Sequence, residues 1–274
     1  MLAIDRNPIQ EGRGDRCLQS DLGDPVVAQA IVDGGYDAAF LLAGSGSVGA
    51  SLADPDLDLA DNAGKLLRFL ESVRRKLPKT RLVYVSSAAV YGEVQQLPVT
   101  ESAPLRPISP YGVSKLAGES YARVYHQIYA LDTLIARPFS VYGPGARKQV
   151  VWDLLVKLHS GEAAQLQGTG QETRDFVYVD DACAALVNIA LAGVPGLAYN
   201  VCSGRETSIA DLAASLSRLA GKPSVSFAGA ARIGDPTRWC GDPSRLREIG
   251  WEAKVDLDLG LAQTLGWYLS LESR

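Results

Sequence analysis

Short apolar runs alternate along this chain with longer segments in which apolar residues recur at helical spacing. The short runs, typical of strands buried on both faces, are residues 2–5, 36–43, 81–86, 131–136 and 198–201. The segments with helical spacing are residues 61–77, 111–129 and 179–191. This alternation predicts an α/β fold in which helices cover both faces of a parallel sheet, the doubly wound class.

The pattern changes after about residue 141, where Gly, Pro and Arg become frequent and strands are harder to recognise. We therefore expect a larger domain formed by residues 1–141, to which residues 176–201 return. Residues 142–175 and 202–274 are expected to form a smaller lobe. The chain shows no internal repeat and no low-complexity segment.

Composition excludes several classes of protein. The 27 basic and 31 acidic residues leave a net charge of −4, which disfavours a nucleic-acid binder with a broad basic surface. No apolar run is long enough to span a membrane, and the first ten residues lack the features of a signal peptide. The 4 cysteines are far apart and the histidines number 2, so we expect no metal site and no disulfide framework. A reducing cytoplasm fits this cysteine pattern best.

The strongest local candidate for chemistry is the segment YGVSK, in which Tyr111 and Lys115 are four residues apart. This spacing places both side chains on one face of a helix, one turn apart. A tyrosine is a poor base at neutral pH because its ordinary pKa is about 10. A neighbouring ammonium group favours the phenolate, so we expect Lys115 to lower the pKa of Tyr111. Taken alone, the pattern also fits a surface helix with a solvated lysine.

Ser87 supplies a third candidate group, because it follows the apolar run at residues 81–86. Ligands of open α/β sheets bind at the carboxyl ends of the strands. A hydroxyl at such a place can hydrogen-bond a substrate oxygen, although a serine there also commonly caps a turn.

Four segments in this order resemble the extended short-chain dehydrogenase/reductases: VSSAAVYG (85–92), SPYGVSK (109–115), ARPFSVYGPG (136–145) and RDFVYVDDA (174–182). More narrowly, they are similar to the NAD-dependent epimerase/dehydratase branch that acts on nucleotide sugars. The resemblance covers nearly the whole chain, and four motifs in register are far more specific than any one of them.

The resemblance implies roles for the three candidate groups. Tyr111 would exchange a proton with a sugar hydroxyl, Lys115 would hold the nicotinamide ribose, and Ser87 would hydrogen-bond the reacting oxygen. NAD would accept a hydride from the sugar carbon and leave a ketone, while the protein supplies position and proton transfer. An epimerase would return the hydride to the other face of the ketosugar.

The resemblance also implies which residues bind the cofactor and the substrate. The cofactor set comprises Asp5, Asp21, Leu22, Leu42, Ala43, Gly44, Asn62, Tyr111, Lys115 and Pro138. Asp5 would accept a hydrogen bond from the adenosine ribose, which favours NAD over NADP. Asn62 could equally be a plain helix cap. The substrate set comprises Ser87, Ser140, Arg174, Arg232 and Asp235, for a UDP-, dTDP- or GDP-linked sugar. A homodimer is implied as well.

The chain departs from the family pattern at its start. The family opens with a strand and the glycine-rich turn GxxGxxG, which receives the cofactor pyrophosphate at a helix N-terminus. This chain opens at what resembles the second strand, so a unit of about 30 residues is expected to be missing. We expect an exposed sheet edge there, with reduced stability or self-association.

Another departure from the family pattern narrows the set of possible reactions. Dehydratases of the family carry an Asp-Glu pair directly after the catalytic Ser or Thr, whereas this chain has Ala88 and Ala89. Alanines cannot perform acid–base chemistry, so dehydration is disfavoured. Ser140 stands where many relatives have an asparagine. The leading hypothesis is therefore a nucleotide-sugar 4-epimerase. The alternatives are a 4-keto-sugar reductase of the same fold and a non-catalytic relative that binds nucleotide sugars.

Overall fold

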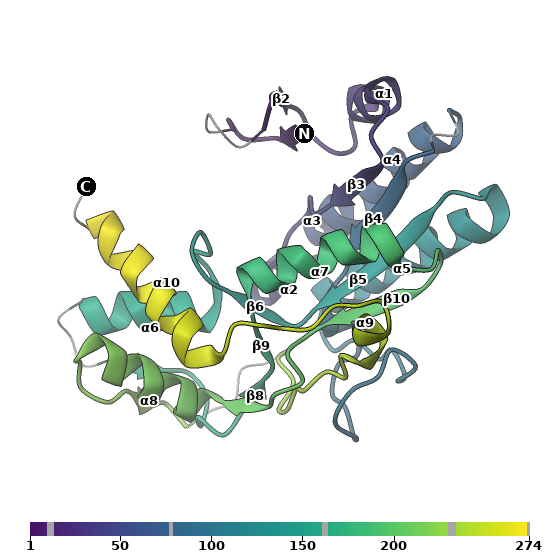
Figure 1. Ribbon diagram of the computed structural model, residues 1–274. Helices are drawn as coiled ribbons and strands as arrows, with labels where there is room; N and C mark the ends of the chain where they lie inside the picture. Colours follow the sequence, from purple (N-terminus) through teal and green to yellow (C-terminus); the bar gives the residue numbers. More distant parts are fainter. Residues whose placement is uncertain (10–13, 77–78, 161–163, 230–233, 273–274) are drawn as a thin grey trace. The chain divides into compact units, whose positions relative to one another are not determined.

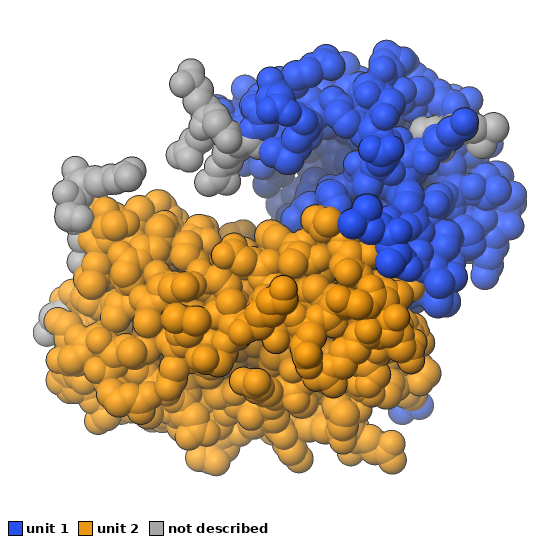
Figure 2. Space-filling view, in the orientation of Figure 1, with its two compact units in different colours: residues 1–92, 105–137, 189–198 blue, residues 93–104, 138–188, 199–274 orange. Residues whose placement is uncertain are grey.

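The chain divides into two compact units, which Figure 2 shows in different colours. The structure is a computed structural model that describes residues 1–9, 14–76, 79–160, 164–229 and 234–272 (Figure 1). Unit 1 comprises residues 1–92, 105–137 and 189–198, and unit 2 comprises residues 93–104, 138–188 and 199–274. Residues 93–104, which the sequence analysis places in the first domain, thus belong to unit 2.

Unit 1 alternates strands and helices along the chain. Its strands are β1 (Leu2–Asp5), β2 (Arg16–Gln19), β3 (Ala38–Leu41), β4 (Arg81–Val85) and β5 (Thr133–Pro138). The last residue of β5, Pro138, already belongs to unit 2. Its helices are α1 (Pro25–Gly34), α2 (Val48–Ala53), α3 (Pro55–Leu59), α4 (Lys65–Arg74) and α5 (Pro110–Tyr129). A π-helical segment, η1 (Ala60–Gly64), connects α3 to α4, and a 3-10 turn, η2 (Ala88–Val90), follows β4.

The main sheet has the strand order β10-β5-β4-β3, where β10 (Ala198–Val201) begins at the end of unit 1. Strands β3, β4 and β5 are parallel, with Ala38 paired to Arg81 and Leu82 paired to Thr133. Successive residues of β4 and β5 are buried, because both faces of the sheet are covered. The predicted parallel α/β fold is therefore confirmed.

Strands β1 and β2 form a separate two-stranded parallel sheet, in which Leu2 pairs with Arg16. Within the described ranges β3 is an edge strand, hydrogen-bonded on one side to β4. The edge expected near the first strands is thus found at β3. Ile4 and Leu18 still pack against the core of unit 1, which consists mainly of apolar residues from α1, α4, β4 and α5.

Local signals explain where the helices of unit 1 begin and end. Asp24 caps α1 by accepting a hydrogen bond from the Val26 amide, Pro25 occupies the first turn, and Gly35 ends the helix with φ 59°. Asp54 caps α3 in the same way, through the Leu57 amide at 2.9 Å. Helical structure therefore starts before residue 61, where the sequence analysis expects it to begin, and α4 ends at Arg74 rather than at residue 77.

Unit 2 is built on short strands and four longer helices. Its strands are β6 (Ser140–Tyr142), β7 (Gln165–Leu166), β8 (Thr173–Arg174), β9 (Phe176–Tyr178), most of β10, β11 (Thr207–Ser208) and β12 (Ser226–Phe227). Its helices are α6 (Gln149–His159), most of α7 (Val179–Ala192), α8 (Ile209–Ala220), α9 (Ser244–Glu248) and α10 (Leu257–Glu272).

The strands of unit 2 pair in twos, β6 with β9, β8 with β11, and β7 with β12. Strands of two or three residues carry no visible alternation, which explains why the sequence pattern is hard to interpret there. Leu154, Leu155, Leu212, Leu216 and Leu261, from α6, α8 and α10, lie at the centre of the core. In the part of the chain that the structure describes, no helix is both long and apolar enough to cross a membrane.

Candidate functional site

Helix α5 begins at a well-formed N-terminal cap, which fixes the positions of Tyr111 and Lys115, one helical turn apart. Ser109 Oγ accepts a hydrogen bond from the Gly112 amide at 3.1 Å, and Pro110 occupies the first turn. A Cβ at Gly112 would lie 2.6 Å from the carbonyl oxygen of Ala89, so the absence of a side chain lets this first turn approach η2 closely. The turn that carries Tyr111 is thereby held against the end of β4.

Lys115 lies one turn further along α5 and is 4% exposed. Its Nζ donates a hydrogen bond to the Val85 carbonyl at 3.0 Å, at the last residue of β4. The ammonium group also lies 5.4 Å from the ring centroid of Tyr84 and 5.9 Å from that of Tyr111. The predicted shared helix face is confirmed, and it faces the carboxyl end of the sheet.

Ser87 follows β4 and caps η2, since its Oγ accepts a hydrogen bond from the Ala89 amide at 3.2 Å. Its side chain also lies beside the Tyr111 phenol, and this interaction acts to lower the pKa of Tyr111. The structure therefore brings Ser87, Tyr111 and Lys115 together. The turn-capping interpretation of Ser87 and the functional one are compatible, because one hydroxyl makes both contacts.

Burial controls the pKa values of this cluster. It raises the pKa of Tyr111 above the ordinary value, while the interaction with Ser87 acts in the opposite direction. Burial also lowers the pKa of Lys115 to about 8. The expectation that Tyr111 has a lowered pKa is thus wrong for the protein without bound ligands. The expectation considered the nearby cation and omitted the cost of placing a phenolate away from water.

Beneath Ser87, a buried ionic cluster joins α5 to the ends of β4 and β5. Ser86 Oγ donates a hydrogen bond to Glu119 Oε1 at 2.7 Å, and Arg137 donates to the same carboxylate. Arg137 Nη1 also donates to the Tyr91 hydroxyl at 2.7 Å. None of these residues is among the candidates predicted from the sequence. The i, i+4 continuation of Tyr111 and Lys115 to Glu119 is the signal that could have found the carboxylate.

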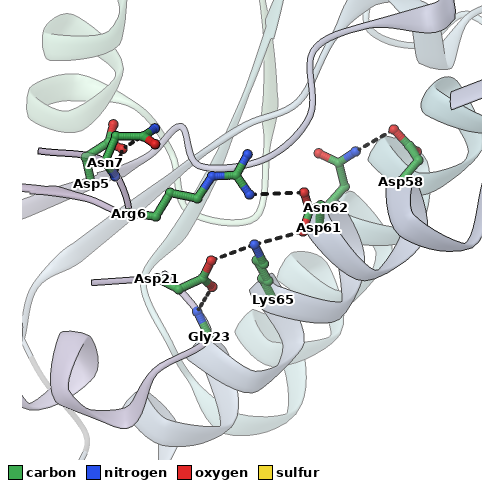
Figure 3. Close-up of polar contacts among 9 residues, drawn as sticks. All are labelled: Asp5, Arg6, Asn7, Asp21, Gly23, Asp58, Asp61, Asn62 and Lys65. Atoms are coloured by element: carbon green, nitrogen blue, oxygen red, sulfur yellow. Dashed lines mark hydrogen bonds and ion pairs between the residues drawn. The ribbon is translucent and has the colours of Figure 1, made fainter. Parts of the chain in front are cut away.

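Two expected cofactor residues at the first strands, Asp5 and Asp21, carry carboxylates that are hydrogen-bonded to neighbouring side chains (Figure 3). Asp5 ends β1, is exposed, and accepts hydrogen bonds from the amide and the side chain of Asn7 at 2.8 and 3.1 Å. Asp21 Oδ2 accepts a hydrogen bond from Lys65 Nζ at 2.6 Å. Lys65 also pairs with Asp61 at 2.8 Å, so this one lysine binds both Asp61 and Asp21, the latter an expected cofactor residue. Leu22 packs against the core of unit 1.

Asn62 lies inside η1 and is 2% exposed, so it is not the helix cap that the sequence alternatively allows. Its Nδ2 donates a hydrogen bond to Asp58 Oδ1 at 3.1 Å (Figure 3). Its Oδ1 is buried and has no hydrogen-bond partner among the described residues. A Cβ at Gly44, which has φ 144°, would collide with this oxygen. Leu42, Ala43 and Gly44 are exposed after β3.

Among the described residues expected to bind substrate, Ser140, Arg174 and Asp235 lie in unit 2, and Ser87 lies in unit 1. Arg174 Nη1 donates hydrogen bonds to the carbonyls of Thr173 and Pro236 at 2.8 and 2.9 Å, and its Nη2 lies 3.7 Å from Asp235 Oδ2. Burial lowers the pKa of Arg174. The structure thus joins Arg174 and Asp235 as an ion pair. The amide of Ser140 donates a hydrogen bond to the Asp175 carbonyl at 2.9 Å. Pro138, an expected cofactor residue, is the first residue of the second segment of unit 2. Arg232 is outside the described residues.

A sequence profile of the NAD dependent epimerase/dehydratase family matches residues 1–202. The chain belongs to this family. It is 31% identical over 256 residues to a UDP-glucose 4-epimerase of Mycolicibacterium smegmatis, covering 92% of this chain and 82% of that protein. Two solved structures agree with this assignment.

The first solved structure is UDP-glucose 4-epimerase from Thermotoga maritima with UDP-glucose. It superposes with a TM-score of 0.90 at 27% identity, covering 99% of this chain and 91% of that one. The second is the dTDP-glucose 4,6-dehydratase DesIV from Streptomyces venezuelae with NAD bound. It has a TM-score of 0.87 at 29% identity and covers 94% of this chain and 80% of that one. This epimerase/dehydratase family member is therefore an enzyme of a family whose cofactor is NAD.

The residues of unit 1 fit such a cofactor. The unpartnered Asn62 Oδ1 is a buried acceptor that needs a donor, and the absence of a side chain at Gly44 leaves space directly beside it. Asp5 offers an exposed carboxylate at the carboxyl end of β1, which can accept hydrogen bonds from ribose hydroxyls. These groups match the hydroxyl-rich ribose moieties of a dinucleotide.

Proposed function

We propose that this enzyme is an NAD-dependent nucleotide-sugar 4-epimerase that oxidises the sugar transiently to a 4-ketone. The observation that carries the proposal is the cluster of Ser87, Tyr111 and Lys115 at the carboxyl end of β4, with Ala88 and Ala89 directly after Ser87. The UDP-glucose 4-epimerases among its relatives support the same reaction.

In this mechanism Tyr111 exchanges a proton with the sugar hydroxyl that becomes the ketone. Ser87, which lies beside the Tyr111 phenol, forms a hydrogen bond with the reacting oxygen of the sugar. Lys115, anchored on the Val85 carbonyl, places a positive charge close to the phenol. Bound NAD supplies the acceptor for the hydride that leaves the sugar carbon. In the oxidation step the Tyr111 phenolate accepts the proton of the sugar hydroxyl, and the neutral phenol so formed, which burial favours, gives that proton back in the return step.

Epimerisation is favoured over 4,6-dehydration by the two residues after Ser87. Ala88 is fully buried and Ala89 is nearly so, and both belong to η2. Loss of water from the sugar needs an acid and a base at neighbouring carbons. Methyl groups at these two positions cannot supply either. The dehydratases among its relatives therefore share the fold and the cofactor, while the reaction proposed here differs from theirs.

We assign the substrate to the UDP- or dTDP-linked sugars that its relatives act on or bind. Arg174 and the expected Arg232 would contact the diphosphate, Asp235 a ribose hydroxyl, and Ser140 the sugar or the diphosphate. The Arg174–Asp235 pair, whose nearest charged atoms are 3.7 Å apart, would have to separate for this.

The test is product analysis of the purified chain with NAD and, in turn, UDP-glucose, UDP-galactose, UDP-N-acetylglucosamine and dTDP-glucose. An epimerase interconverts the 4-epimers, seen by proton NMR of the sugar, and leaves the reduced-nicotinamide absorbance unchanged. Stoichiometric consumption of reduced cofactor with a 4-keto sugar would instead indicate a reductase. Release of water to a 4-keto-6-deoxy sugar would overturn the proposal.

A further inference from the structure

A second carboxylate is buried beside the Tyr111–Lys115 pair and has no role in the mechanism above. Asp58 belongs to α3, which packs against α5, and it is 3% exposed. Ionised carboxylates are rarely buried this deeply unless a charge or several hydrogen bonds compensate them. The hydrogen-bond donors and charged groups around the Asp58 carboxylate therefore indicate its role.

Two neutral groups hold the Asp58 carboxylate in place. Ser114 Oγ donates a hydrogen bond to Oδ2 at 2.6 Å, and Asn62 Nδ2 donates to Oδ1 at 3.1 Å (Figure 3 shows the second contact). Ser114 directly precedes Lys115, and its Oγ also lies 3.0 Å from the Tyr111 carbonyl. Asp58 is thus tied to the same helical turn that carries both proposed catalytic groups.

The charge of Asp58 is balanced through space rather than by direct contact. The titratable groups that share this buried region are Lys115 and Tyr111 on α5, Tyr84 on β4, and Glu119 one turn beyond Lys115. Glu119 is already paired with Arg137 and Arg123. Lys115 is therefore the cation left to balance Asp58 within the described part of this cluster.

We propose that Asp58 is a positioning residue: its buried carboxylate, fixed by Ser114 and Asn62 beside the helical turn that carries Tyr111 and Lys115, sets the pH range of proton transfer in this cluster. The inference rests on the roles given to Tyr111 and Lys115 in the proposed function. Asp58, held by Ser114, thereby joins the cluster of Ser87, Tyr111 and Lys115 as its acidic member.

The directions of the pKa shifts agree with this role. Burial lowers the pKa of Lys115 to about 8, and the charge of Asp58 acts against that decrease. Burial raises the pKa of Tyr111, and Asp58 raises it further. Removing the charge should therefore lower both pKa values. Lys115 would lose its proton at a lower pH, and Tyr111 would become a base at a lower pH.

The first experiment follows Lys115 by NMR in protein labelled with ¹³C-lysine, with the resonance assigned by comparison with Lys115→Arg. Asp58→Asn should move the titration midpoint of Lys115 downward by at least about 0.5 pH unit. Asp56→Asn is the matched control, since Asp56 is an exposed residue of the same helix and should leave the midpoint unchanged. Asp58→Ser, which is smaller and keeps a hydroxyl near Ser114, serves if the asparagine variant does not fold.

The second experiment measures the pH profile of turnover. The rising limb should move to lower pH in Asp58→Asn and stay in place in Asp56→Asn. A shifted Lys115 midpoint in a chain that shows no epimerase activity would support the role of Asp58 and contradict the proposed function. An unchanged Lys115 midpoint in a folded charge-removing variant would overturn the inference, whatever the activity.

Discussion

Arg137 donates two hydrogen bonds to the carboxylate of Glu119, from Nε at 2.9 Å and from Nη2 at 2.7 Å, and neither side chain is more than 1% exposed. This fork ties the end of β5 to the middle of α5. Because Ser86 donates to the same carboxylate, the pair also holds the residue that precedes Ser87. A buried ion pair thus supports the backbone on which the proposed chemistry depends.

We expect Glu119→Gln to lower the free energy of unfolding by about 3–5 kcal/mol, because it removes the carboxylate charge that pairs with the buried Arg137 guanidinium. Urea unfolding followed by circular dichroism measures this. Asp258→Asn is the control, since it removes a carboxylate from an exposed pair with Arg218 and should change stability little. If Glu119→Gln lowered the free energy of unfolding as little as the control does, the Glu119–Arg137 pair would not have the structural role assigned to it.

Tyr111→Phe should reduce turnover by about 10²–10⁴-fold while leaving nucleotide-sugar affinity close to that of the wild type. The variant removes only the hydroxyl that exchanges the proton. Turnover assays and calorimetric titration separate the two effects. Tyr121→Phe, at an exposed position on the same helix, should be fully active. Activity of Tyr111→Phe comparable to this control would exclude Tyr111 as the acid–base group.

Burial of Lys115 predicts a specific pH dependence of stability. The pKa of Lys115 is lowered to about 8, whereas an unfolded lysine has a pKa of about 10.4. Between these values the unfolded chain binds more protons, so the wild type should gain stability as pH rises through this window. Below pH 8 the cost of burying the charge is present in full.

Unfolding of the wild type and of Lys115→Met should therefore be compared between pH 7 and pH 10.5. We expect the wild type to gain about 1–3 kcal/mol relative to the variant across the window. Lys76→Met, at an exposed lysine after α4, should give a difference that does not vary with pH. Parallel pH curves for the wild type and Lys115→Met would rule out a lowered pKa at Lys115.

Gly44→Ala should weaken NAD binding by about tenfold, because its Cβ would displace Asn62 Oδ1 and its φ of 144° disfavours a side chain. Gly46→Ala is a closely matched control: nothing lies within 4 Å of a Cβ at Gly46. The dissociation constant for NAD, measured by calorimetry, checks this expectation. Equal affinity in the two variants would remove Asn62 and Gly44 from the cofactor site.

Much of the fold could be predicted because its signals are local. The apolar runs at β4, β5 and β10 and the helical spacing of α5 and α7 correspond closely to the observed elements. Helix α1 was missed, although Asp24 and Pro25 form an ordinary start signal. Strand β2 has four residues with little burial, so its pattern carries no clear alternation.

The candidate site was predictable where its members share one motif. Tyr111 and Lys115 lie one turn apart on α5, and Ser87 follows a buried strand, as the motifs imply. Asp58, Lys65 and Arg137 were not found, because each acts on a partner far away in the sequence. No periodicity connects α3 to α5 or β5 to α5. Only packing brings those side chains together.

The sequence by itself determined the parallel sheet, the shared face of Tyr111 and Lys115, and the family, since each depends on local periodicity or on motifs in order. The tertiary structure alone decided the electrostatics of the site. Burial raises the pKa of Tyr111 and lowers that of Lys115, opposite to what each group would do in water beside a single partner. The physical reason is that desolvation depends on every atom that packs around a group, and that set exists only once the chain has folded.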